Sequence, residues 1–150
     1  MLFDSILVTT DFSRASSVAF DLALYQAKAV HGNITLLTVL CSEDFSTQIL
    51  PEEEFMRQKR EELQDLASCS FHKYSPECVI LRSRTTAQDA ILQYLEEEPI
   101  NLIVLASHGH TANKELPMGG TAQSILHCAP YPVLLIPSFT ETGYRIQKRP

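Results

Sequence analysis

The sequence at residues 100–136, INLIVLASHGHTANKELPMGGTAQSILHCAPYPVLLI, decides the fold. It contains two short apolar runs, Ile100–Ala106 and Pro132–Ile136, and each has the length and β-branched content of a buried strand. Between them, Gly119-Gly120 opens a helical pattern that Pro130 brings to an end. A strand, a helix and a second strand in this order predict two parallel strands joined by a helical crossover.

The same alternation of strand and helix runs through the rest of the chain. Three further apolar runs are predicted strands: Ser5–Thr10, Asn33–Leu40 and Cys78–Leu81. Three helices are predicted between these strands. The first follows Ser13 and ends at Gly32, with Val18, Leu22, Tyr25 and Ala29 on its apolar face. The second runs from Pro51 to about Ala67, and the third starts at the capping residue Thr86 and continues through Ile91 and Leu95. Residues 41–50 are expected to be irregular. The alternation predicts an α/β fold in which helices cover both faces of a five-stranded parallel sheet, a Rossmann-like arrangement.

Composition limits the classes of partner. The formal net charge of the 150 residues is −6, and an acidic surface repels both nucleic-acid phosphates and anionic membranes, so neither is expected as a partner. The four cysteines form no C-x-x-C pair, which predicts reduced, mostly buried thiols and a cytoplasmic location. We expect one domain over residues 1–138 and a polar, partly disordered tail over residues 139–150.

Loops that follow the strands are the expected place for a ligand. In a parallel sheet covered on both faces, ligands bind beyond the carboxyl ends of the strands, which here points to Thr9–Ser13, Val39–Cys41 and Ala106–Thr121. Gly109, Gly119 and Gly120 bring backbone N–H groups close to an anion, and Gly119-Gly120 stands at a helix start. These glycines predict a phosphate cradle, with tight turns as the equally open alternative.

Three segments resemble the universal stress protein family. They are the strand end Val8–Ser13 (VTTDFS), the run Asn101–Gly109 (NLIVLASHG) and the run Met118–Pro137. ATP-binding members carry G-x2-G-x9-G-[ST], and this pattern falls here on Ala106, Gly109, Gly119 and Gly120, of which the second and third match. Ala106 adds a methyl group where the first glycine is expected, and Gly120 lacks the hydroxyl that would contact phosphate. Thr121, one residue later, is a partial substitute for that hydroxyl.

The resemblance implies a role for further residues. Asp11 is expected beside the ribose or a bound metal ion, with capping of the following turn together with Ser13 as an equally open role. The main chain at Val39 is expected beside adenine, and Thr9 and Leu105 are expected to line the same pocket. The implied ligand is ATP or AMP, with or without Mg²⁺, and the implied role is that of a cytosolic stress-response module that reports energy state. We assign no catalytic residue and no metal ligand, although slow ATP hydrolysis stays open.

Alternatives from other classes remain beside this hypothesis. The chain can instead be a dimeric interaction protein that has lost nucleotide binding, with unidentified protein partners. The apolar run Pro132–Ile136 would form a sheet edge, and bare edges tend to pair. The resemblance implies a homodimer through the same strand. A zinc site at His108, His110 and His127-Cys128 does not have the spacing of a known finger. A hydrolytic trio of Ser13, Asp11 and His108 has no G-x-S-x-G elbow to support it.

Overall fold

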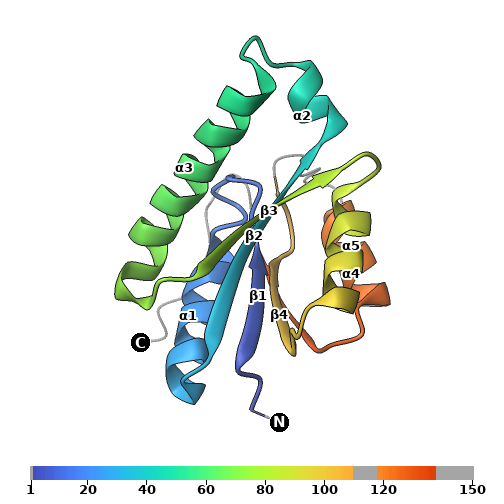
Figure 1. The fold of residues 1–150 in the computed structure, drawn as a ribbon. Helices are drawn as coiled ribbons and strands as arrows, with labels where there is room; N and C mark the ends of the chain where they lie inside the picture. The colour runs from blue at the N-terminus through green and yellow to red at the C-terminus, as the bar shows by residue number, and fades with distance from the viewer. Residues whose placement is uncertain (1, 110–117, 138–150) are drawn as a thin grey trace.

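The computed structural model describes residues 2–109 and 118–137. Along the chain, the elements are β1 (Ser5–Thr9), α1 (Val18–Val30), β2 (Asn33–Cys41), α2 (Ser42–Ser46), α3 (Glu52–Phe71), a 3₁₀ turn (His72–Tyr74), β3 (Glu77–Ser83), α4 (Ala87–Glu97), β4 (Leu102–Ala106), α5 (Gly120–Cys128) and β5 (Val133–Ile136) (Figure 1). The predicted tail at residues 139–150 and His110 of the possible zinc site lie outside the described residues.

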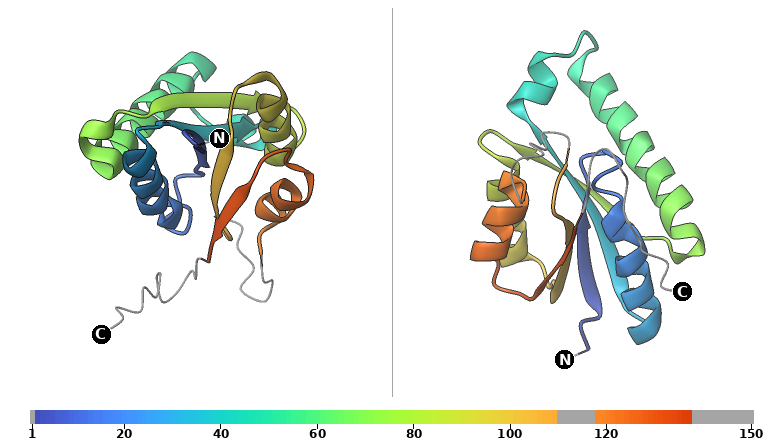
Figure 2. Two further views of the ribbon diagram at one scale, coloured as in Figure 1. Left: turned by 90° about the horizontal axis from the view of Figure 1, so that it is seen from below. Right: turned by 180° about the vertical axis from the view of Figure 1, so that it is seen from behind.

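The five strands form one parallel sheet in the order β3-β2-β1-β4-β5. After β1 the chain moves outward to β2 and β3, and it then returns to the other side of β1 with β4 and β5. Helices α1 and α3 cover one face of the sheet, and α4 and α5 cover the other (Figures 1 and 2). The predicted α/β fold is therefore confirmed, and its switch point lies between β1 and β4.

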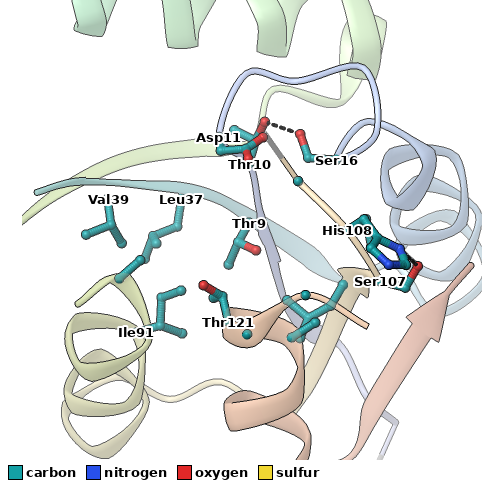
Figure 3. Close-up of a pocket in the computed structure, with 17 residues that line it drawn as sticks. Thr9, Thr10, Asp11, Ser16, Leu37, Val39, Ile91, Ser107, His108 and Thr121 are labelled. Carbon is teal, nitrogen blue, oxygen red and sulfur yellow. Dashed lines mark hydrogen bonds between the residues drawn. The ribbon is translucent and has the colours of Figure 1, made fainter. Parts of the chain in front are cut away.

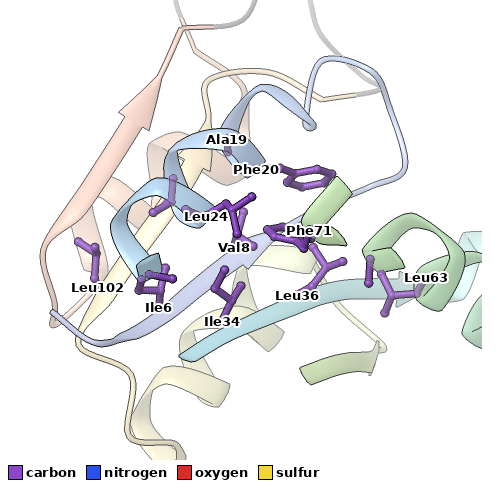
Figure 4. Packing of buried hydrophobic residues seen from close by; sticks show 14 residues of the cluster. Ile6, Val8, Ala19, Phe20, Leu24, Ile34, Leu36, Leu63, Phe71 and Leu102 are labelled. Atoms are coloured by element: carbon purple, nitrogen blue, oxygen red, sulfur yellow. The ribbon is translucent and has the colours of Figure 1, made fainter. Parts of the chain in front are cut away.

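Alternating side chains of the central strands supply two separate cores. Ile6 and Val8 of β1 pack with α1 and α3, whereas Leu7 between them packs with α4 and α5, and all three are 0% exposed. The first core also contains the rings of Phe20 and Phe71, whose centroids lie 5.3 Å apart (Figure 4). Strands covered on both faces are apolar along their whole length, which makes them easy to recognise in the sequence.

The predicted buried face of α1 is wrong. The residues buried against the sheet are Ala19, Phe20, Ala23, Leu24 and Ala27. Tyr25, which the prediction placed inside, is 71% exposed. Small alanine side chains let the helix approach the sheet closely, so the alanine-rich stripe is buried rather than the stripe with larger residues.

The end of α1 also differs from the prediction. His31, not Gly32, adopts the left-handed conformation that ends the helix, with a φ of 53°. Gly32 is needed for a different reason, because a Cβ there would lie 2.5 Å from the carbonyl oxygen of Asp4. The glycine therefore permits a close approach of two backbones where β1 begins.

Two boundaries in the middle of the chain were also missed. Residues 41–50 contain the short helix α2, which a capping box with Cys41 in the usual serine position initiates; the Cys41 N–H donates to Asp44 Oδ2 at 2.7 Å. Helix α3 continues beyond Ala67 to Phe71, because Phe71 is buried in the first core. In the described part of the chain, no helix combines the length and hydrophobicity needed to cross a bilayer.

Candidate functional site

A pocket of about 140 Å³ opens at the carboxyl ends of β1, β2 and β4, on the side of the sheet that α4 and α5 cover (Figure 3). It lies at the switch point of the strand order, where ligands of such sheets bind. The structure brings all nine residues predicted for the site to the lining of this pocket: Thr9, Asp11, Val39, Leu105, Ala106, Gly109, Gly119, Gly120 and Thr121.

One side of the pocket is apolar. Leu37 and Val39 of β2, Leu105 of β4 and Ile91 of α4 contribute aliphatic side chains, and Leu37, Val39 and Ile91 gather on the same side in Figure 3. Leu37 and Ile91 were not predicted as site residues. The signal was present, since Leu37 lies two residues before Val39 and so points to the same face of the strand. Ile91 lies on the predicted inner face of its helix.

Hydrogen bonds hold the loop between β1 and α1 in a compact turn. Asp11 Oδ1 accepts the Ser13 N–H at 3.0 Å, which is the turn-capping role that the sequence left open. The buried hydroxyls of Thr10 and Ser16 lie 2.9 Å apart, and Ser16 N–H donates to Ser13 Oγ at 3.1 Å. Thr10 and Ser16 also line the pocket, although neither was predicted to do so.

Phe12 connects this loop to the neighbouring helix α3. Its backbone adopts a positive φ of 66°, and the Lys59 ammonium of α3 lies 4.8 Å from the centre of its ring. The same ammonium lies 5.7 Å from the ring of Phe55 and pairs with Glu62 at 2.9 Å. A cation over an aromatic face is attractive, so Lys59 joins the loop to the helix.

Asp11 also contacts the glycine loop after β4. A Cβ built on Gly109 would lie 2.2 Å from Asp11 Oδ2 and 3.1 Å from its Cγ. The carboxylate therefore occupies the space that any larger residue at position 109 would need. The φ of Gly109 lies outside the left-handed region, so the glycine matters here through this close approach, and a Cβ would displace the end of the Asp11 side chain.

The pair Gly119-Gly120 starts α5. Gly119 is the N-cap, and its N–H donates to the carbonyl oxygen of Ser107 at 2.7 Å, so this predicted cradle amide is already engaged. Gly120 opens the first turn, and a Cβ there would meet nothing within 4 Å. The first-turn amides of a helix have no partner within the helix, and Gly120, Thr121 and Ala122 of this first turn line the pocket.

Thr121 and His108 make local contacts within the pocket wall. The Thr121 hydroxyl donates to Gln88 Oε1 of α4 at 3.4 Å, a long hydrogen bond that joins α4 to α5. His108 Nδ1 lies 2.8 Å from Ser107 Oγ and shares a hydrogen bond with it. The hydrolase alternative placed Ser13 beside this histidine, whereas the serine in hydrogen-bond contact with His108 is Ser107.

The cysteines are more exposed than the sequence suggested. Cys69 and Cys128 lie on the surface, whereas Cys41 and Cys78 are half-buried. Burial, together with neighbouring carboxylates, raises the pKa of the Cys41 and Cys78 thiols.

Within residues 2–109 and 118–137, no three potential ligands among His, Cys, Asp and Glu gather in a way that would hold a metal ion.

Known structures share this architecture. Universal stress protein UspA from Lactobacillus plantarum superposes with a TM-score of 0.70 at 23% identity, over 89% of this chain and 97% of that one. A universal stress protein in complex with cAMP gives a TM-score of 0.60 at 18% identity, over 89% and 96% of the two chains. The universal stress protein from Archaeoglobus fulgidus in complex with dAMP gives 0.61 at 18% identity, over 90% and 98%. No curated protein sequence matches the chain.

These likenesses establish the fold, and a family model goes further. The model of the universal stress protein family matches residues 2–137, which span every helix and strand described above. The match includes the strand end at Asp11 and both glycine segments that line the pocket. The chain therefore belongs to the universal stress protein family.

Proposed function

We propose that this chain binds an adenine nucleotide in the pocket at the switch point between β1 and β4. The observation that carries the proposal is the convergence of nine residues, nominated from four separate segments, on one pocket with a helix N-terminus at its end. The relatives solved with cAMP and with dAMP support the adenine nucleotide class.

The base would occupy the apolar side of the pocket. The volume of about 140 Å³ is close to that of a cavity that holds one benzene molecule, so a planar ring system fills the inner part while ribose and phosphate lie toward the mouth. Leu37, Ile91 and Leu105 would contact the faces of the ring. The main chain at Val39 would bind its polar edge, and Thr9 would lie beneath it.

The phosphate would bind at the start of α5. The first-turn amides and the positive end of the helix dipole favour an anion there, and the exposed Gly120 leaves room for it. Asp11 would lie beside the ribose or a Mg²⁺ ion. The ligand would be ATP or AMP, and its occupancy would report energy or stress state in the cytoplasm, with binding rather than turnover as the main role.

Calorimetric titration with AMP and with Mg-ATP tests this proposal. The structure offers a matched pair of variants at Gly120, because nothing lies within 4 Å of a Cβ there. Gly120→Ser restores a hydroxyl at the phosphate and should tighten binding by about 1 kcal/mol, roughly fivefold. Gly120→Ala fits equally well but adds no hydroxyl, so it should leave the affinity unchanged. No heat at millimolar nucleotide for any of the three proteins would reject the proposal.

Turnover is checked separately. Any ATP hydrolysis by purified protein should be slow, and it should disappear in Asp11→Ala if it arises in this pocket. Rapid product formation that depends on Asp11 would instead make the chain an enzyme.

A second candidate function is that of a dimeric interaction protein without nucleotide. Two observations favour it: Gly119 N–H is already bound to Ser107, and β5 is an uncharged edge strand whose Leu134 side chain is 39% exposed. Unpaired strand edges tend to pair, so β5 would join a second copy of itself. Leu134→Asp should convert a dimer to a 16.8 kDa monomer in sedimentation. A monomeric wild-type protein would reject the dimer.

A further inference from the structure

A second cavity, of about 330 Å³, opens at the amino ends of the strands, the end of the sheet opposite the first pocket (Figure 1). Ser5, Asn33 and Glu77, which are the first residues of β1, β2 and β3, line it together with residues from the end of α4. None of the residues that line the first pocket lines this one. A ligand here would therefore be independent of the proposed nucleotide.

Apolar and aromatic side chains form a large part of the cavity wall. Ile34 and Ile100 contribute aliphatic side chains that are 3% and 4% exposed, and Tyr74 and Tyr94 contribute half-buried rings. The Tyr74 hydroxyl donates to the carbonyl oxygen of Ala27 at 3.0 Å, which holds this side chain in place. A concave wall of this kind suits the hydrocarbon part of a small organic ligand.

The charge of the cavity is negative. Among the described residues that line it, the two charged ones are Glu77 of β3 and Glu98, which follows the last turn of α4. Burial raises the pKa of Tyr94, and the carboxylates of Glu98 and Glu77 raise it further, so both carboxylates lie near its phenol group. Within residues 2–109 and 118–137, neither carboxylate takes part in an ion pair. The carboxyl end of α4 adds to this negative potential.

We infer that this cavity binds a small organic cation, namely an ammonium group on a short hydrocarbon chain. The ammonium would lie between the carboxylates of Glu77 and Glu98, where the tyrosine rings also attract a cation. The hydrocarbon chain would pack on Ile34 and Ile100. A metal ion suits the cavity less well, because it would gain nothing from the aliphatic wall and, in the described part of the chain, no three acidic, histidine or cysteine side chains gather to hold one.

The test uses three probes that share a four-carbon chain and differ in charge: butylammonium, 1-butanol and butyrate. Binding to the full chain is measured at low salt, without nucleotide, from backbone amide NMR signals. Glu77→Gln, Glu98→Gln and their combination remove the charges with little change of shape. Glu96→Gln is the matched control, because it removes the same charge from an exposed position of α4 that does not line the cavity.

Butylammonium should shift the signals of Thr35, Glu77 and Glu98 saturably, with a dissociation constant on the order of 10 mM. 1-Butanol and butyrate should bind at least about tenfold more weakly, since they lack the positive charge. Each single variant should weaken butylammonium by about two- to fivefold, which is the range for an exposed ion pair, and the double variant should bind it no better than 1-butanol. Glu96→Gln should stay within about 1.5-fold of wild type.

Three results would overturn the inference. Equal affinity for butylammonium and 1-butanol would show a purely apolar cavity. Equal butylammonium affinity of wild type and the double variant, or an equal loss in Glu96→Gln, would show general attraction to an acidic surface. The absence of saturable shifts at the cavity in wild type would show that no such site exists. Because the two pockets share no residue, none of these results bears on nucleotide binding, which the AMP and Mg-ATP titrations test separately.

Discussion

Replacing Gly109 by alanine tests the contact on which the geometry of the site depends. The added Cβ would lie 2.2 Å from Asp11 Oδ2, and such contacts are essentially never shorter than 3.0 Å, so the carboxylate has to move by at least about 0.8 Å. A shift of this size breaks or strains its 3.0 Å hydrogen bond with the Ser13 N–H. Loss of a hydrogen bond to a charged group costs about 1.5–3 kcal/mol, which lowers the melting temperature of a chain of this length by about 3–12 °C.

A double-mutant cycle separates this clash from any other effect of alanine. Thermal and urea unfolding of wild type, Gly109→Ala, Asp11→Ala and the double variant give the four free energies of unfolding. In the Asp11→Ala background the space beside residue 109 is free, so Gly109→Ala should be neutral or stabilising by about 0.4–1 kcal/mol. The coupling between the two positions should then be at least about 1.5 kcal/mol. An equal loss of stability in both backgrounds would refute the close contact, as would an unaltered Gly109→Ala protein.

Three further outcomes follow from other parts of the fold. Gly32→Ala should lower the free energy of unfolding, measured in urea, by about 2–3 kcal/mol, because its Cβ would meet the Asp4 backbone at 2.5 Å. Gly120→Ala is the control and should leave the free energy of unfolding unchanged, because its Cβ would meet nothing within 4 Å. Similar stabilities for the two variants would contradict this. Hydroxyl hydrogen bonds from Thr85 and Thr86 lower the pKa of Asp89, so its stabilising effect on α4 is present above the ordinary pKa of about 3.9 and is lost as pH falls through the lower folded value. Asp89→Asn should therefore reduce the melting temperature at neutral pH but not in strong acid, and a gap that is independent of pH would exclude this account. The raised pKa values of Cys41 and Cys78 predict that iodoacetamide modifies them more slowly than the exposed Cys69 and Cys128, which peptide mass spectrometry measures; equal rates would count against the half-buried setting.

Much of the fold was predictable because its signals are local. Strands buried on both faces appear as apolar runs such as Asn33–Leu40, and the alternation with helices implies parallel pairing. The buried face of α1 was not predictable in this way. Its stripe of Ala19, Ala23 and Ala27 is buried because small residues permit close packing, which depends on the sheet opposite rather than on hydrophobicity along the helix.

The composition of the site was more predictable than its contacts. Gly109 and Gly119 stand out in the sequence as backbone-approach residues, and both line the pocket. Their partners could not be predicted, since the Asp11 carboxylate beside Gly109 and the Ser107 carbonyl bound to Gly119 N–H depend on how two loops meet in three dimensions. Thr10 and Ser16 were missed for the same reason, because their paired hydroxyls are recognisable only after the turn has formed.

The position of Lys59 between two aromatic rings gives the pocket a mechanical connection to the outside of the molecule. Phe12 directly follows Asp11, so a residue that lines the pocket and the ring under the Lys59 ammonium are neighbours in one loop. The ammonium in turn holds Phe55, which lies in the first turn of α3 and packs edge-on against Phe45 of α2 at 5.2 Å. The loop at the pocket and the outer helices α2 and α3 therefore meet through Lys59.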